Sequence, residues 1–205
     1  MLLIDWVKLE LRRRVTKLLL DPSRRKKIRE KRENKRRAEN KPHQVFYLHQ
    51  VDDPYSHLCC QILDQLENSY DIELMPLVVG TPPPSSTPEV DMLKKHSIED
   101  ATVIAPYYGL TFGTSETDIE PENIKIAQSI LLGTEQESFA KISLEVGEAL
   151  WRNDTEKLKT LQKNAAILSD EEISESININ NQKQKQLGHY YGGVFAYEGE
   201  CYGGI

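Results

Sequence analysis

The sequence is poor in cysteine and in long apolar runs, and each shortage excludes a class of protein. Its 205 residues include 3 cysteines, too few for a disulfide-stapled fold. No CxxC, CxxH or HExxH spacing occurs, which removes the common dithiol and zinc signatures. No run of about 18 apolar residues occurs, so no segment is predicted to span a bilayer. Asp5, Lys8 and Glu10 interrupt any secretory apolar region, and a cytoplasmic protein with reduced thiols is expected.

What the chain has in excess is charge, and the charge is divided unevenly. Residues 1–42 hold 16 Lys+Arg and 6 Asp+Glu, a net charge of +10. The remaining 163 residues hold 10 and 26, a net charge of −16, which together give the −6 of the whole chain. Such a split predicts a basic arm over residues 1–42 and an acidic globular domain over residues 43–205. That domain is long enough to bury one good hydrophobic core.

The arm is predicted to begin with an amphipathic helix over residues 2–20. Its apolar residues recur at steps of three and four: Ile4, Val7, Leu11, Val15 and Leu18. Asp21-Pro22-Ser23 ends this helix, and the basic stretch that follows is polar all round. We favour a helix that docks on protein, followed by a charged spacer. Contact with an anionic membrane surface is the second interpretation. Nucleic acid is the least supported partner, because no aromatic residue interleaves the basic run.

The acidic domain opens with a β-α-β pattern. Residues 45–51 are β-rich and predict a strand. Asp53 and Pro54 are natural residues for the N-cap and first position of a helix, whose apolar face continues to Leu66. Residues 72–80 predict the next strand, which a right-handed crossover would place parallel to the first.

The second half of the domain is predicted to be helical and then to end in a hairpin. A Pro-rich loop at 81–86 precedes residues 87–163, which have helical spacing, with a start signal at 120–122. A polar stretch at 175–186 leads to the last predicted element. There, two short strands turn at Glu198-Gly199.

This order of elements resembles the DsbA-like branch of the thioredoxin fold. Within that branch it resembles 2-hydroxychromene-2-carboxylate isomerases, kappa-class glutathione transferases and their uncharacterised bacterial relatives. The segments that carry the resemblance are residues 46–58, 105–110 (APYYGL) and 195–200 (FAYEGE). It implies an α/β, thioredoxin-like fold with a helical insertion at about 85–175, between the β-α-β half and the C-terminal hairpin.

The chain departs from these relatives at the start of the first domain helix. Redox members carry C-P-x-C there, whereas this chain carries Asp53-Pro54-Tyr55-Ser56, so dithiol exchange at that position is chemically impossible. Isomerase-like and transferase-like members place a serine where Asp53 stands. A carboxylate at a helix N-terminus is expected to be stabilised in its charged form and to repel a thiolate. Asp53, Tyr55 and Ser56 are the candidate catalytic residues, and we interpret Asp53 chiefly as a helix cap.

Two further departures concern the end of the chain. Relatives place a cis-proline where Gly193 stands, and we expect the peptide bond before Gly193 to be trans. Pro54, Gly193 and Val194 are the candidate ligand-binding residues. The relatives continue past the hairpin into a helix, while this sequence ends at Ile205. A protein partner, a further C-terminal domain or the residue 2–20 helix is therefore expected to cover that face of the sheet.

Two functions remain open. We favour a redox-inactive binding or scaffold module with no cofactor. The alternative is a glutathione-dependent isomerase-like or transferase-like enzyme, or an oxidoreductase by family, that binds a small or glutathione-like ligand beside Asp53. A metal site built from Asp52, His49, His57 and His189 is not favoured, because spacing is its only support.

Overall fold

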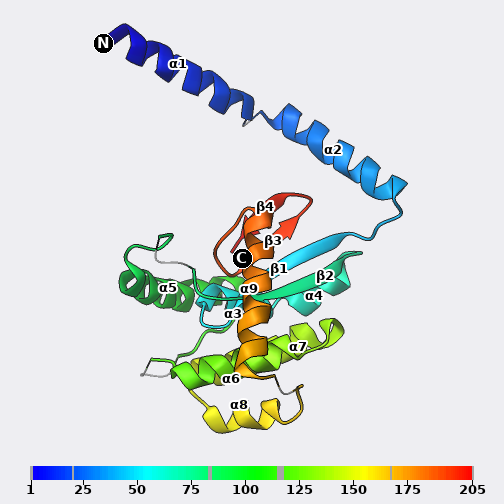
Figure 1. The fold of residues 1–205 in the computed structure, drawn as a ribbon, viewed down its shortest axis with the longest axis vertical. Helices are drawn as coiled ribbons and strands as arrows, with labels where there is room; N and C mark the ends of the chain where they lie inside the picture. Colours follow the sequence, from blue (N-terminus) through cyan, green and yellow to red (C-terminus); the bar gives the residue numbers. More distant parts are fainter. Residues whose placement is uncertain (1, 20, 83–84, 115–117, 167, 205) are drawn as a thin grey trace. The chain divides into compact units, whose positions relative to one another are not determined.

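The structure is a computed structural model that describes every residue except 1, 20, 83–84, 115–117, 167 and 205, and the side chains of 2–5 and 18–19. The chain divides into two compact units, Met1–His43 and Gln44–Ile205 (Figure 1). Each unit is described by itself below. In the described residues, no helix has both the length and the apolar character needed to cross a membrane.

The first unit consists of two helices, α1 (Leu2–Leu19) and α2 (Pro22–Ala38). Helix α2 begins where the sequence predicts, because the Asp21 side chain caps it by accepting the Ser23 N–H at 2.9 Å. None of its residues is buried. Leu20, predicted in the first helix, lies outside the described residues, as do the side chains of Ile4 and Leu18.

The second unit is built on a four-stranded sheet in the order β2-β1-β3-β4. As predicted, β1 and β2 are parallel, with Gln44 opposite Glu73. Strand β3 runs antiparallel to β1, and the predicted hairpin turn lies at Glu198 and Gly199, both with positive φ (47° and 72°). The strands are β1 (Gln44–Gln50), β2 (Glu73–Val79), β3 (Val194–Tyr197) and β4 (Glu200–Gly203).

The helix predicted after β1 is two helices, α3 (Pro54–Cys60) and α4 (Leu63–Ser69). The break coincides with Gln61, whose side-chain amide bonds both the carbonyl and the N–H of Thr111, at 2.7 and 3.0 Å. A contact between segments far apart in sequence thus accompanies a break that local periodicity did not predict.

The helical insertion confirms the predicted start at Glu120-Pro121. The prediction that residues 87–163 are helical throughout is wrong at 109–120, where the described residues form no helix. Gly109 ends the preceding turn in a left-handed conformation (φ 69°) that glycine adopts readily. The elements are α5 (Val90–Ile104), η1 (Ala105–Tyr108), α6 (Pro121–Leu132), η2 (Gln136–Ser138), α7 (Phe139–Trp151) and α8 (Thr155–Gln162).

The polar stretch at 175–186 belongs to an 18-residue helix, α9 (Asp170–Leu187), which the sequence reading missed. Ser169 and Glu172 form a reciprocal capping box at its start. The helix packs on the edge strand β2 through polar groups: Asn180 Nδ2 donates to the Val78 carbonyl at 2.9 Å, and Asn181 Oδ1 accepts the Gly80 N–H at 3.0 Å. Apolar contacts act beside these bonds: Ile173 is buried near the start of α9, and Ile177 lies 3.1 Å from where a Cβ at Gly80 would be.

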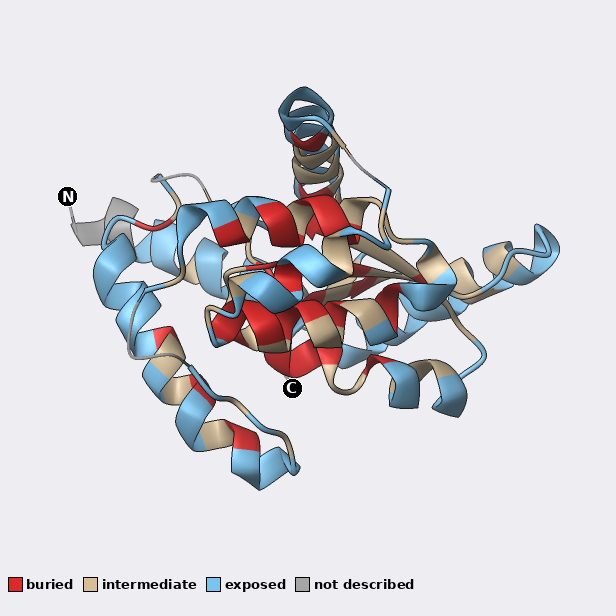
Figure 2. Ribbon diagram, turned by 90° about the horizontal axis from the view of Figure 1, so that it is seen from below, coloured by how far each residue is buried: buried red, intermediate tan, exposed pale blue. Residues whose placement is uncertain are grey.

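The core of the second unit lies between the sheet and the helices of the insertion (Figure 2). Tyr47 on β1 is fully buried and stacks on Phe195 of β3, with ring centroids 4.9 Å apart. Phe139 of α7 meets Tyr47 edge-on at 6.4 Å. The first β-α-β half and the insertion therefore share one hydrophobic core.

Gly147 of α7 should be intolerant of a side chain. A Cβ added there would overlap the buried ring of His57 on α3. We expect Gly147→Ala to lower the free energy of unfolding by about 1–3 kcal/mol, although alanine favours a helix. Gly113→Ala is the matched control, because nothing lies within 4 Å of its added Cβ. Urea unfolding of both variants tests this, and equal stabilities would contradict it.

Candidate functional site

The candidate site is the first turn of α3, together with the short segment that connects β1 to this helix. Asp53 has extended backbone angles (φ −101°, ψ 121°) and Pro54 follows as the first helical residue. Asp53 Oδ2 accepts two hydrogen bonds from Ser56, one from its N–H and one from its hydroxyl, both at 2.7 Å. The predicted capping role of Asp53 is confirmed.

The one hydroxyl proton of Ser56 is already used in a hydrogen bond inside the protein. Its side chain is fully buried, and its Oγ donates to Asp53 while accepting the Gln50 N–H at 3.1 Å. The Ser56 carbonyl in turn accepts the hydroxyl of Tyr47 at 2.7 Å. Ser56 therefore joins β1 to α3 and positions Asp53.

The pKa of Asp53 is raised, opposite to the sequence expectation. Burial raises it from 3.8 to about 6, the two hydrogen bonds from Ser56 lower it, and the neighbouring Asp52 charge raises it further. The expectation considered only the helix N-terminus and omitted the loss of water around the carboxyl group. Near neutral pH this carboxyl group can exchange a proton, which is what general acid–base chemistry requires.

The loop before β3 closes directly onto this turn. A Cβ at Gly192 would lie 2.6 Å from Ser56 Oγ, and Gly193, with φ +62°, has Ser56 N and Tyr55 carbon atoms 3.1 Å from its Cβ position. No peptide bond among the described residues is cis. The Gly193 carbonyl contacts the Cys59 thiol at 3.8 Å. Only glycines allow so close an approach.

The structure places the six predicted site residues in different surroundings. Asp53, Ser56 and Gly193 come together, and Pro54 is buried beside them. Val194 is buried in β3. The Tyr55 side chain instead reaches α5, where its hydroxyl donates to Asp100 at 2.7 Å. Burial and this carboxylate raise the pKa of Tyr55 to about 12, so it stays protonated.

None of the three cysteines provides a reactive thiolate. Cys59 and Cys60 are buried in α3, and burial raises the pKa of both, that of Cys60 to about 11. Cys201 on β4 donates to the Leu187 carbonyl at 3.3 Å, and burial raises its pKa as well. Thiols with raised pKa values are poor nucleophiles.

The histidines considered for a metal site lie in unlike environments. His49 is buried and bonds the Tyr47 hydroxyl at 3.1 Å. His57 is buried against α7, and its Nδ1 has no partner. The described residues contain no group of three His, Cys, Asp or Glu side chains placed to hold a metal ion.

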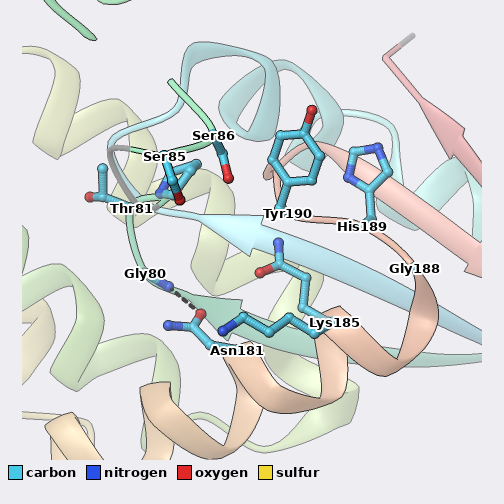
Figure 3. A pocket seen from close by; sticks show the side chains of 11 residues that line it. Gly80, Thr81, Ser85, Ser86, Asn181, Lys185, Gly188, His189 and Tyr190 are labelled. Atoms are coloured by element: carbon cyan, nitrogen blue, oxygen red, sulfur yellow. Dashed lines mark hydrogen bonds between the residues drawn. The ribbon is translucent and has the colours of Figure 1, made fainter. Parts of the chain in front are cut away.

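A pocket that the sequence reading missed lies where β2 ends and α9 ends. It has a volume of about 630 Å³, and it is lined by the loop after β2, the last turns of α9 and residues 188–190. Figure 3 shows Asn181 and Lys185 of α9 facing Thr81, Ser85 and Ser86 of the loop. We call it the β2–α9 pocket. Asn181, Gln184 and Lys185 recur at helical spacing, a signal that required the helix to be recognised first.

Hydrogen bonds fix the polar groups of the β2–α9 pocket. Asn181 Oδ1 accepts the Gly80 N–H, which leaves its amide N–H groups as donors. His189 Nδ1 accepts the Tyr191 N–H at 3.2 Å, which places the proton of the neutral ring on Nε2. Gln184 donates to the Tyr191 carbonyl at 3.0 Å. Tyr191 directly precedes Gly192, so pocket and α3 turn share one loop.

No protein-family model matches the chain, and no curated protein matches it. Among solved structures it is similar to 2-hydroxychromene-2-carboxylate isomerase in its selenomethionine form. The alignment covers 78% of this chain and 88% of that chain, with a TM-score of 0.53 and 15% identity. The chain has a thioredoxin-like fold. At this identity the likeness establishes the fold alone, and the fold class predicted from the sequence is confirmed.

Replacing Asp53 should change how stability depends on pH. Because the folded-state pKa of about 6 lies above the unfolded value of 3.8, the stabilising contribution of Asp53 is complete below about pH 4 and is lost as the pH rises through 6. Asp53→Asn keeps an acceptor for Ser56. We expect its stability relative to the original protein to increase by about 1–3 kcal/mol between pH 4 and pH 7, measured by urea unfolding.

The difference in unfolding free energy between Asp53→Asn and the original protein reports the titration of Asp53 alone. His49 and His57, whose pKa values burial lowers to about 3 and about 4, make both proteins more stable as the pH rises, and their contributions cancel. In the original protein, the carboxyl carbon of Asp53 should titrate near pH 6 by nuclear magnetic resonance. A midpoint near the ordinary value of 3.8 would contradict the assignment.

Proposed function

We propose that the chain is a thioredoxin-fold binding module without thiol chemistry, which holds a small organic carboxylate in the β2–α9 pocket. The observation that carries the first half is the Asp53–Ser56 pair. It fills the turn where redox relatives carry their thiols, and the Ser56 hydroxyl is used internally. The three cysteines, with raised pKa values, offer no substitute.

The second half of the proposal rests on Lys185. Its ammonium group is the one formal charge lining the pocket among the described residues, and it makes no ion pair with any of them. One cation surrounded by hydroxyl, amide and imidazole N–H donors matches a ligand with one negative charge.

The carbonyl groups at the end of α9 do not act as the negative partner of the Lys185 ammonium group. The carbonyls of Gln184 and Lys185 accept the N–H of Gly188, and the Leu187 carbonyl accepts the Cys201 thiol. Three of the last four carbonyl groups of this helix are therefore already paired. Tyr190 adds a half-exposed aromatic ring, stacked on His189 with ring centroids 5.7 Å apart, against which the apolar body of a ligand can pack.

The proposed ligand class agrees with the name of the structural neighbour. It is named for its action on a carboxylate with a fused-ring body. We carry over to this chain only the chemical class, because 15% identity establishes no shared substrate.

The second candidate is an isomerase-like or transferase-like enzyme that uses glutathione. The observation that favours it is the Asp53 carboxyl group, whose pKa of about 6 suits proton transfer. Against it, Ser56 offers no hydroxyl to a glutathione thiolate, and an ionised Asp53 would repel that thiolate. We therefore place binding ahead of catalysis.

Lys185→Gln should weaken carboxylate binding. We expect 2-naphthoate to bind the full chain and its affinity to fall about tenfold or more in the variant, measured by calorimetry. Lys183→Gln on the same helix is the matched control, because Lys183 lies over the Phe46 ring and not in the pocket. The neutral 2-naphthamide should bind more weakly than the carboxylate, and equal affinities would contradict the proposal.

The full chain should not reduce insulin, because it has no reactive thiolate. Reduction that disappears in Cys201→Ser would show that this thiol is active and would contradict the proposal.

Calorimetry with glutathione distinguishes a binding module from a glutathione-dependent enzyme. The original protein should show no micromolar affinity, and Asp53→Ser, which removes the negative charge, should bind more tightly. Micromolar binding by the original protein would favour the enzyme.

A further inference from the structure

We infer that the N-terminal unit binds anionic lipid surfaces, with α1 lying in the interface and α2 held against the headgroups. This inference concerns residues 1–43 and is independent of the proposed ligand. It rests on three properties of the two helices: an exposed apolar stripe, the distribution of their basic residues, and the way their glutamates are paired.

The apolar stripe of α1 is open to solvent within its own unit. Val7, Leu11 and Val15 follow one another at steps of four, and their exposed fractions are 52%, 62% and 46%. Trp6, at the edge of this stripe, is 62% exposed. Tryptophan combines an apolar ring with one polar N–H and is enriched at the boundary between lipid and water. A helix of this kind lies in the plane of that boundary.

The basic residues of α2 surround the whole helix. Lysines and arginines occupy 10 of its 17 positions, and Ile28 is its only large apolar residue. An interface with a folded protein or with one DNA groove needs charge concentrated on one face. A fluid lipid surface of negative charge does not, because long side chains on every side of the helix can bend toward it.

Glutamates of the two helices form ion pairs with arginines of the same helix. Glu10 pairs with Arg13 and Arg14 within α1, and Glu33 pairs with Arg36 and Arg37 within α2. Both glutamates are held close to cations of their own helix, and residues 1–42 as a whole carry a net charge of +10. The unit therefore presents an apolar stripe followed along the chain by excess positive charge, which is the combination that anionic membranes select.

Trp6 provides a site-specific readout in the full chain. The sequence contains 2 tryptophans, and the other, Trp151, is 2% exposed within the second unit. On mixing with vesicles, a blue shift of emission and protection from acrylamide should come from Trp6. We expect both with vesicles of about one-third phosphatidylglycerol in phosphatidylcholine, and neither with phosphatidylcholine alone. Raising the salt from about 0.1 to about 0.5 M should weaken binding about tenfold or more.

Matched variants locate the interaction. Arg24→Gln, Arg25→Gln and Lys27→Gln together should lower vesicle affinity about tenfold or more, and Leu11→Asp should abolish the blue shift. The control replaces three lysines of the second unit by glutamine: Lys141, Lys159 and Lys163. It removes the same charge and should leave binding unchanged. Equal loss in the control would overturn the inference. So would duplex DNA binding that depends on Arg24, Arg25 and Lys27 together with no shift on vesicles.

Discussion

The organisation of the second unit depends on one buried hydroxyl group. Ser56 Oγ accepts the last N–H of β1 from Gln50 and donates to the Asp53 carboxyl, so strand, helix cap and helix meet at a single atom. Gly192 passes so close to that atom that a Cβ there would lie 2.6 Å away. The loop that carries the chain into β3 is thereby held against the start of α3, next to β1, with which β3 pairs.

That contact also shapes the chemistry of the domain. Cysteines in C-P-x-C would need room and exposure at the start of the helix, whereas here Pro54 and Ser56 are buried and the Asp53 carboxyl group is bonded to its own helix. Burial rather than the helix N-terminus decides the pKa of Asp53. The open volume is the β2–α9 pocket, which Lys185 lines, and our proposed function places the ligand there.

Short-range patterns predicted much of the fold. The β-rich runs, the Asp53-Pro54 cap and the Glu198-Gly199 turn were each recognisable, because the residues that form them are adjacent in sequence. Helix α9 was missed because much of its packing face is polar: Asn180 and Asn181 bond the end of β2, beside the two apolar residues Ile173 and Ile177. The break between α3 and α4 was missed because Gln61 pairs with Thr111, fifty residues away.

The sequence by itself determined the strands, the cap at the start of α3, the absence of the dithiol and the division of charge between arm and domain, since these depend on residue type and local spacing. Only the tertiary structure decided which groups are available. In the fold, the Ser56 hydroxyl bonds Asp53, and the Tyr55 hydroxyl bonds Asp100. Burial raises the pKa of Asp53. Gly80, Asn181 and His189 line one pocket. Burial and long-range contact depend on segments distant in the chain, and local sequence does not encode them.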